Sequence, residues 1–179
     1  MAGTVALLAA STLLAGCDTT AQFAPSLTRV VGLQTVNHSL SILTGAPCRD
    51  VTRIVVLFRG DGDIPSSRTQ LTAETPTTVD QLVVGGEASA AGFTTSEPLP
   101  AGFDWRDHTE MDISFDGPAG DLGGATSVLE PVERRGLRHA GDGTAYIRDE
   151  GWLTPKQIAS GDTRSFLTAC TPDPEQGQR

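Results

Sequence analysis

The chain has 179 residues, and its 22 acidic and 13 basic side chains give a formal net charge of −9 at pH 7. Because phosphate binding needs clustered cations, this acidic balance argues against nucleic acid as a partner. The length is sufficient for one domain with one hydrophobic core.

The chain opens with a short apolar block, residues 5–15, which runs into the sequence Leu-Ala-Gly-Cys at residues 14–17. The block has the length of a signal peptide and is too short to span a bilayer. Residues 14–17 resemble the lipobox of bacterial lipoprotein precursors, in which a signal peptidase cuts before the cysteine and the cysteine receives acyl chains. The resemblance implies a signal peptide over residues 1–16 and a diacylglycerol or acyl lipid on Cys17. It also implies export and attachment to the outer face of the bacterial cytoplasmic membrane, or elsewhere in the cell envelope.

The alternative to an anchor is a buried helix over residues 5–15, with Cys17 as an ordinary thiol. Residues 17–27 lack periodicity, which predicts a lipidated tether. Residues 171–179 contain two prolines, two glutamines and a glycine, which predicts a disordered tail. These limits leave residues 28–170 as a single β-rich domain.

The two remaining cysteines, Cys48 and Cys170, form an even pair in a chain that is expected to be exported. Such a pair is most simply interpreted as a disulfide. The bridge would close a loop of about 120 residues and contribute on the order of 4–5 kcal/mol to stability on the chain-entropy account. The competing interpretation, a metal or redox site, has neither a Cys-x-x-Cys spacing nor a paired histidine.

Short β segments separated by clusters of Gly, Pro, Asp and Ser fill the first half of the domain. Strands are predicted at residues 28–36, 39–43, 51–58, 68–73 and 79–84. Asn37 and His38 suit a turn between the first two strands. Residues 54–58 are apolar on both faces, which is typical of a central strand. The spacing of the later strands is typical of a sandwich or barrel.

The middle of the domain combines a long loop with the most regular strand pattern. Residues 85–104 are rich in Gly, Ala, Ser and Pro, which predicts a surface loop. The strand predicted at 109–115 alternates in hydropathy, so that Met111, Ile113 and Phe115 face the core and the residues between them face solvent.

The last part of the domain is predicted to hold short strands and one helix. Strands are predicted at residues 126–132, 144–149 and 163–169, with an Arg-rich connection at 133–143. Residues 155–160 are predicted to be helical, with Thr154 as N-cap and Pro155 at the first helical position. The whole pattern favours an all-β fold, a two-sheet β sandwich with one short helix near the C-terminus. The alternative is an α+β fold.

The densest polar cluster lies just before and within the strand predicted at 109–115. On an extended chain His108, Glu110 and Asp112 would point to one side, and an imidazole with two carboxylates is a suitable ligand set for a divalent metal. The alternative is a strand whose polar outer face serves solubility, because no second histidine is nearby in sequence.

Two further groups of residues are candidates for binding a partner. Arg134, Arg135 and Arg138 form a cationic patch that could bind anionic lipid headgroups, a wall polymer or an acidic protein face. The alternative is a solvated hairpin, since neighbouring acidic residues partly neutralise the patch. Phe103 and Trp105 could form an aromatic platform for sugar rings, or could pack in the core and hold the long loop in place.

Readily recognised catalytic motifs such as Gly-x-Ser-x-Gly and His-Glu-x-x-His do not occur in the sequence. A dispersed catalytic site remains open, since triad residues need not be adjacent. We therefore expect a non-catalytic binding, accessory or scaffold domain, with no cofactor besides its lipid and with the membrane and an envelope protein or wall polymer as partners. The alternatives are a metal-assisted hydrolase that uses His108, Glu110 and Asp112, and a small-ligand carrier with an apolar cavity in the sandwich.

Overall fold

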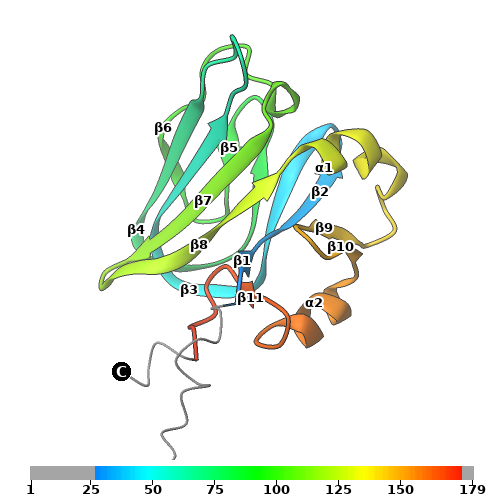
Figure 1. Cartoon of the computed structure of the whole chain (residues 1–179). Coiled ribbons are helices and arrows are strands. Elements are labelled where there is room, and N and C mark those ends of the chain that lie inside the picture. Colours follow the sequence, from blue (N-terminus) through cyan, green and yellow to red (C-terminus); the bar gives the residue numbers. More distant parts are fainter. Residues whose placement is uncertain (1–26, 175–179) are drawn as a thin grey trace, which may run out of the picture.

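A computed structural model describes residues 27–174 of the chain. Its strands are β1 (Arg29–Val30), β2 (Gly32–Val36), β3 (Ser39–Arg59), β4 (Ser67–Val84), β5 (Ala88–Ser89), β6 (Thr94–Glu97), β7 (Glu110–Gly117), β8 (Gly120–Val128), β9 (Ala145–Ile147), β10 (Gly151–Leu153) and β11 (Leu167–Thr168). Its helices are α1 (Glu130–Arg135) and α2 (Pro155–Gly161), with 3-10 turns η2 (Trp105–Asp107) and η3 (Gly136–Arg138). Figure 1 shows α1 and α2 on the side of the molecule that carries β2, β9 and β10.

Two long strands, β3 and β4, form the spine of the fold. They pair antiparallel along their length, with register shifts between Leu43 and Arg53. In this stretch Gly45 (φ 81°) and Asp50 (φ 59°) take left-handed backbone conformations, and Pro47 lies between them. Because these residues interrupt the regular ladder, the strand bends here, and Figure 1 shows β3 curving at the lower end of the molecule.

The bend makes each long strand contribute to both layers of the fold. β2 pairs with the first half of β3 and β7 with the second half. β9 and β10 extend the layer of β2, and β8 extends the layer of β7. The strands predicted at 39–43 and 51–58 are therefore two halves of β3, and those predicted at 68–73 and 79–84 are two halves of β4. The predicted all-β sandwich is confirmed.

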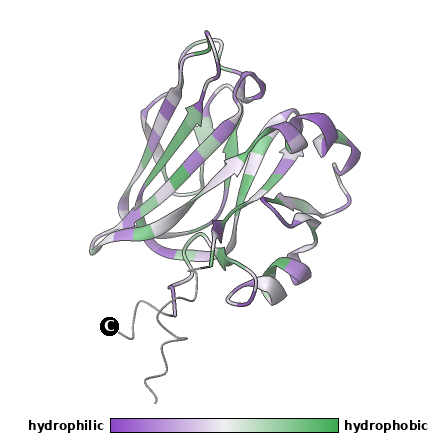
Figure 2. Cartoon of the chain, in the orientation of Figure 1, coloured by the Kyte–Doolittle hydropathy of each residue, from purple (hydrophilic) through white to green (hydrophobic). Residues whose placement is uncertain are grey.

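The hydrophobic core lies between the layers. Alternate residues of β3 from Ile54 to Phe58 are fully buried. On β7, Met111, Ile113 and Phe115 are buried as predicted, while the residues between them are partly exposed. Figure 2 shows this alternation of hydrophobic and hydrophilic residues along β7.

The predicted turn at Asn37 and His38 joins β2 to β3. Both residues have positive φ, 49° and 66°, which is the backbone geometry of a tight two-residue hairpin turn. The His38 carbonyl oxygen accepts hydrogen bonds from the indole N–H of Trp105 (3.3 Å) and from Nη2 of Arg106 (2.7 Å). These two bonds attach the turn to η2.

Five elements differ from the sequence predictions: α1, η3, β5, β6 and β10. α1 and η3 occupy residues expected to form the end of the 126–132 strand and the 133–143 connection. Pro131 explains the helix, because proline cannot donate to a strand ladder but suits the first helical turn. Acidic residues in the first turn and arginines in the last also match the helix dipole. In addition, β5 and β6 lie within the predicted 85–104 loop, and β10 forms where no strand was expected.

The predicted helix and disulfide are both present near the C-terminus. α2 begins at a capping box in which Thr154 and Gln157 bond each other's backbone. Cys48, in the bend of β3, forms a disulfide with Cys170, and their Cα atoms lie 5.3 Å apart. The bridge thus attaches the segment after β11 to the spine of the fold.

Some sequence predictions concern residues outside the described range. The signal peptide at 1–16, the lipid site Cys17, nearly all of the 17–27 tether and the end of the 171–179 tail lie there. Among residues 27–174, no helix is both long and apolar enough to cross a membrane.

Candidate functional site

The predicted metal ligands lie on two sides of β7. His108 caps η2 and precedes the strand, and its imidazole turns into the core beside the rings of Phe58 and Phe103, with centroids 5.8 and 5.2 Å away. Its Nδ1 lies 3.1 Å from the Asp104 carbonyl oxygen, and its buried Nε2 has no hydrogen-bond partner among residues 27–174. The 3-10 turn before β7 therefore breaks the alternation that the sequence prediction assumed at His108.

Glu110 and Asp112 lie on the opposite, outer face of β7. Asp112 accepts hydrogen bonds from Nε of Arg59 (2.7 Å) and from the hydroxyl of Thr126 (2.6 Å), so both of its oxygens are engaged. Within the described residues, no group of three or more His, Cys, Asp and Glu side chains is placed to hold a metal ion. The geometry does not bring His108, Glu110 and Asp112 together.

The predicted aromatic platform is largely part of the core. Trp105 is 2% exposed, and the guanidinium of Arg106 lies 4.9 Å over its ring. Phe103 is half-buried, with its ring centroid 4.9 Å from that of Phe58. Because Trp105 has no open face, these residues fit the alternative role of packing in the core and holding the long loop.

The predicted cationic patch lies on the helical segment formed by α1 and η3. Arg134, Arg135 and Arg138 are all exposed. Nε of Arg134 pairs with the Glu130 carboxylate one helical turn earlier, at 2.9 Å. The side chains of Arg135 and Arg138 make no ion pair or hydrogen bond within residues 27–174.

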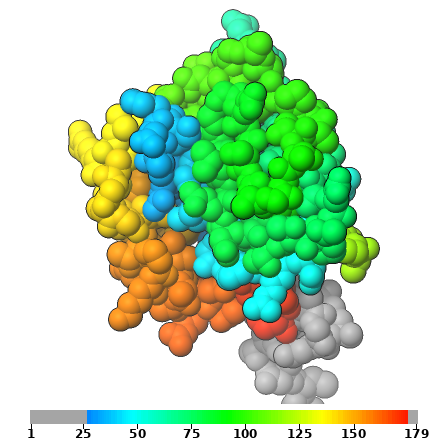
Figure 3. All heavy atoms as spheres, turned by 180° about the vertical axis from the view of Figure 1, so that it is seen from behind, coloured from blue at the N-terminus to red at the C-terminus, as the bar shows by residue number. Residues whose placement is uncertain are grey.

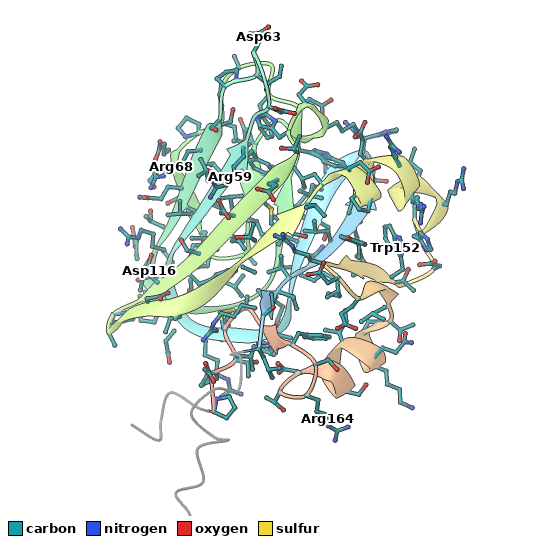
Figure 4. All side chains as sticks on the ribbon, in the orientation of Figure 1. Arg59, Asp63, Arg68, Asp116, Trp152 and Arg164 are labelled. Carbon is teal, nitrogen blue, oxygen red and sulfur yellow. A yellow bond between two sulfur atoms is a disulfide. The ribbon has the colours of Figure 1, made fainter. Side chains whose placement is uncertain are left out.

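A cleft of about 280 Å³ lies between α1 and the β9–β10 hairpin. Its lining residues, which define the Trp152 cleft, are Glu130, Pro131, Arg134, Arg135, Tyr146, Gly151 and Trp152. Figure 4 shows Trp152 on the hairpin, below the α1 and η3 ribbon. The cleft brings Arg134 and Arg135 together with two aromatic side chains, whereas Arg138 lies outside its lining.

The aromatic side chains of this cleft are held in place from two directions. Tyr146 and Trp152 lie opposite each other in the β9–β10 pair, with ring centroids 5.8 Å apart and planes tilted by 59°. The imidazole of His139 stacks on the indole of Trp152, at 4.0 Å and 14°. One face of Trp152 is therefore covered, and its ring is oriented before any ligand binds.

A carboxylate fixes His139 in turn. Asp142 accepts hydrogen bonds from the backbone N–H (2.8 Å) and hydroxyl (2.6 Å) of Thr144, and its other oxygen lies 2.8 Å from Nδ1 of His139. These bonds, with the Thr144 hydroxyl contributing most, lower the pKa of Asp142 to about 2. Asp142 is therefore ionised at neutral pH and connects Thr144 to His139, the ring that stacks on Trp152.

Tyr146 is the one residue with a phenol among those that line the cleft. Partial burial raises the pKa of Tyr146, and the negative charge of Asp149 acts in the same direction. The phenol consequently stays protonated at neutral pH and can donate a hydrogen bond to a ligand.

The helical segment that carries the arginines packs closely on β2. Gly136 is buried there, and a Cβ at this position would overlap the hydroxyl of Thr35. Figure 3 shows the yellow segment lying against the blue β2. This contact holds one wall of the Trp152 cleft on the sandwich.

The arginines of the cleft are predicted from the sequence as binding residues, whereas Tyr146 and Trp152 are not. Tyr146 lies in the strand predicted at 144–149, whereas no strand was predicted at Trp152. Both strands have three residues, too few for alternation to show that the two side chains share a face. The available signal was the turn that joins them, where Asp149 (φ 66°) and Gly151 (φ 86°) have left-handed backbone conformations.

The lining groups of the Trp152 cleft suit binding. They comprise aromatic surface, two guanidinium groups, one carboxylate and one phenol, with no Ser, Cys or His side chain among them. Comparison of the chain with protein families, with curated proteins and with solved structures finds no match in any of the three.

Proposed function

We propose that the protein is a lipid-anchored binding protein of the cell envelope, with an accessory or scaffolding role rather than a catalytic one. Its ligand occupies the Trp152 cleft. The observation that carries the proposal is that two aromatic residues, Tyr146 and Trp152, line one cleft together with Arg134 and Arg135. Ligand sites combine apolar surface with a few polar groups that orient the ligand, and this cleft has both.

The proposed localisation in the cell envelope rests on the resemblance of residues 14–17 to a lipobox, with Cys17 as the acylated residue. In Figure 1, β1 and β11 lie toward the lower end of the molecule and α1 lies toward the upper end. An attachment that precedes β1 would therefore leave the α1 side of the domain open to other envelope components.

The test uses the full chain, produced with its lipid and purified in detergent, and an envelope fraction that contains wall polymer and membrane proteins. We expect the wild-type protein to bind this fraction and Trp152→Ala to bind at least about tenfold more weakly. The reason is that Trp is enriched among the residues that contribute most of the binding free energy. Arg138→Gln is the matched control, because Arg138 is exposed on the same segment but does not line the cleft. Circular dichroism verifies that each variant is folded.

Two results would overturn the proposal. One is a wild-type protein that binds no component of the envelope fraction. The other is a folded Trp152→Ala variant that binds as tightly as the wild type, since the cleft would then not be the binding site.

A further inference from the structure

We propose that the Trp152 cleft binds an acidic sugar, a single pyranose ring that carries a carboxylate or phosphate group. This inference rests on the proposed function and names the class of ligand. It follows from the shape of the aromatic surface, the charge of the cleft wall and the size of the cleft.

Trp152 provides a flat surface of fixed orientation. Its indole is partly exposed, lines the cleft, and is held by the stacked His139 ring at 4.0 Å and by Tyr146 at 5.8 Å. A pyranose presents C–H groups on its face and hydroxyls around its rim, so its face can pack on an indole while its rim stays hydrogen-bonded. Because the indole is already fixed, little conformational entropy is lost on binding.

The charge of the cleft wall selects an anion. The whole chain has a net charge of −9, but the cleft is lined by two arginines and one glutamate. Glu130 pairs with Arg134, which leaves Arg135 without an ion-pair partner within residues 27–174. A guanidinium binds a carboxylate or phosphate through two parallel N–H···O bonds, so Arg135 matches one anionic group on the ligand.

The size and remaining polar groups fit one sugar ring. A volume of about 280 Å³ is just below the usual range for ligand pockets, which favours a small ligand. The Tyr146 phenol can donate to a ring hydroxyl and the Glu130 carboxylate can accept from one. An acidic peptide would also supply a carboxylate, but its backbone would not match the single flat indole face.

The test titrates the full chain with four probes and follows tryptophan fluorescence and heat of binding. The probes are an oligosaccharide of glucuronic acid, its carboxyl-reduced counterpart, a phosphorylated glucan and polyglutamate. We expect the glucuronic acid oligosaccharide, the phosphorylated glucan or both to bind, and the neutral counterpart to bind at least about tenfold more weakly. The carboxylate and phosphate probes distinguish the two sources of the anion.

Variants locate the two contacts separately. Arg135→Gln is expected to lower the affinity for the acidic sugar about tenfold and to leave that for the neutral sugar unchanged, because only the charge-assisted contact is lost. Arg138→Gln, the matched control, should leave both affinities unchanged. Trp152→Ala should remove binding of both sugars.

Failure of this inference is distinguishable from failure of the proposed function. If the envelope fraction binds through Trp152 but no acidic sugar does, or if polyglutamate binds more tightly than the acidic sugars, the ligand class is wrong and the binding role stands. Equal weakening of acidic and neutral sugars by Arg135→Gln would also overturn the acidic ligand. If neither the fraction nor any probe binds, both proposals fall.

Discussion

Gly136 determines how closely the arginine-bearing segment approaches β2. Its backbone angles, φ −56° and ψ −36°, are ordinary for any residue, so glycine is required here for space and not for conformation. An added Cβ would overlap the hydroxyl of Thr35 and lie 3.3 Å from Cγ1 of Val132. One wall of the Trp152 cleft thus depends on the absence of a single methyl group.

Adding a methyl group at residue 136 tests this contact. Gly136→Ala should lower the free energy of unfolding by about 1–3 kcal/mol, the usual cost of overpacking, even though alanine is the better helix former. Urea unfolding of the two proteins measures the difference. Thr35→Ala removes the hydroxyl that the new methyl group would meet, so the double variant should recover part of the loss in a double-mutant cycle. An unchanged stability for Gly136→Ala would contradict the close packing.

At the scale of whole elements, the local sequence pattern predicts a helix or strand well when the element is long or has recognisable capping residues. The alternation of β7 is eight residues long, and α2 has its Thr154 cap and Pro155 in place, so both were predictable. The continuity of β3 and β4 was not, because Pro47 and its neighbours look like the end of a strand when the partner strand is unknown. The bend depends on pairing between residues far apart in sequence.

The same distinction separates the two halves of the candidate site. Arg134 and Arg135 stand out in an acidic chain and were predicted as a binding patch from charge alone. Tyr146 and Trp152 become neighbours only through the β9–β10 pairing, and the hairpin meets α1 only through tertiary packing. His108 shows the opposite case, where a three-residue turn moved one predicted ligand to the other side of the strand.

The loop that supports Trp152 gives a prediction about pH. The pKa of Asp142 is lowered from 3.8 to about 2 because its ionised form receives hydrogen bonds in the folded state. Its contribution to stability is therefore complete well above pH 3.8 and is lost as the pH falls through 2. Asp142→Asn should be less stable than the wild type at neutral pH, and the difference should shrink as the pH falls from about 4 to about 2.

Urea unfolding at a series of pH values measures this difference for Asp142→Asn. Asp63→Asn is the matched control, because Asp63 is an exposed carboxylate for which no hydrogen bond or ion pair occurs in the described part of the chain. Its stability should follow the wild type at every pH. A gap between wild type and Asp142→Asn that stays constant across this range would show that the Asp142 carboxylate is not stabilised in the folded protein.

For the molecule as a whole, the disulfide is a long-range covalent constraint on the described chain. Cys48 and Cys170 are separated by 122 positions, and they connect the bend of β3 to the segment beyond β11. A crosslink of this length restricts the unfolded chain strongly, which corresponds to about 4–5 kcal/mol on the chain-entropy account.

We therefore expect the double variant Cys48→Ala with Cys170→Ala to lose several kcal/mol of unfolding free energy, up to about 5. Urea unfolding of the oxidised wild type, the reduced wild type and the double variant measures the effect. The reduced wild type should match the double variant closely, because both lack the crosslink. Equal stability of the oxidised and reduced proteins would contradict a stabilising bridge.

The proposed anchor and the proposed binding site lie in different parts of the chain, so one can be removed without the other. Ten residues lead from Cys17 to Leu27, the first described residue, so a lipid on Cys17 holds the start of the domain within about 35 Å of the membrane. Two or more acyl chains give stable attachment. Cys17→Ser should therefore lose incorporated radiolabelled palmitate and move from the membrane pellet to the supernatant on fractionation.

The Trp152 cleft, whose lining lies entirely between Glu130 and Trp152, should keep its affinity in the released protein. Wild-type protein that has no lipid and keeps an uncleaved amino terminus would contradict the proposed anchor. It would not contradict the Trp152 cleft, which the binding test examines separately.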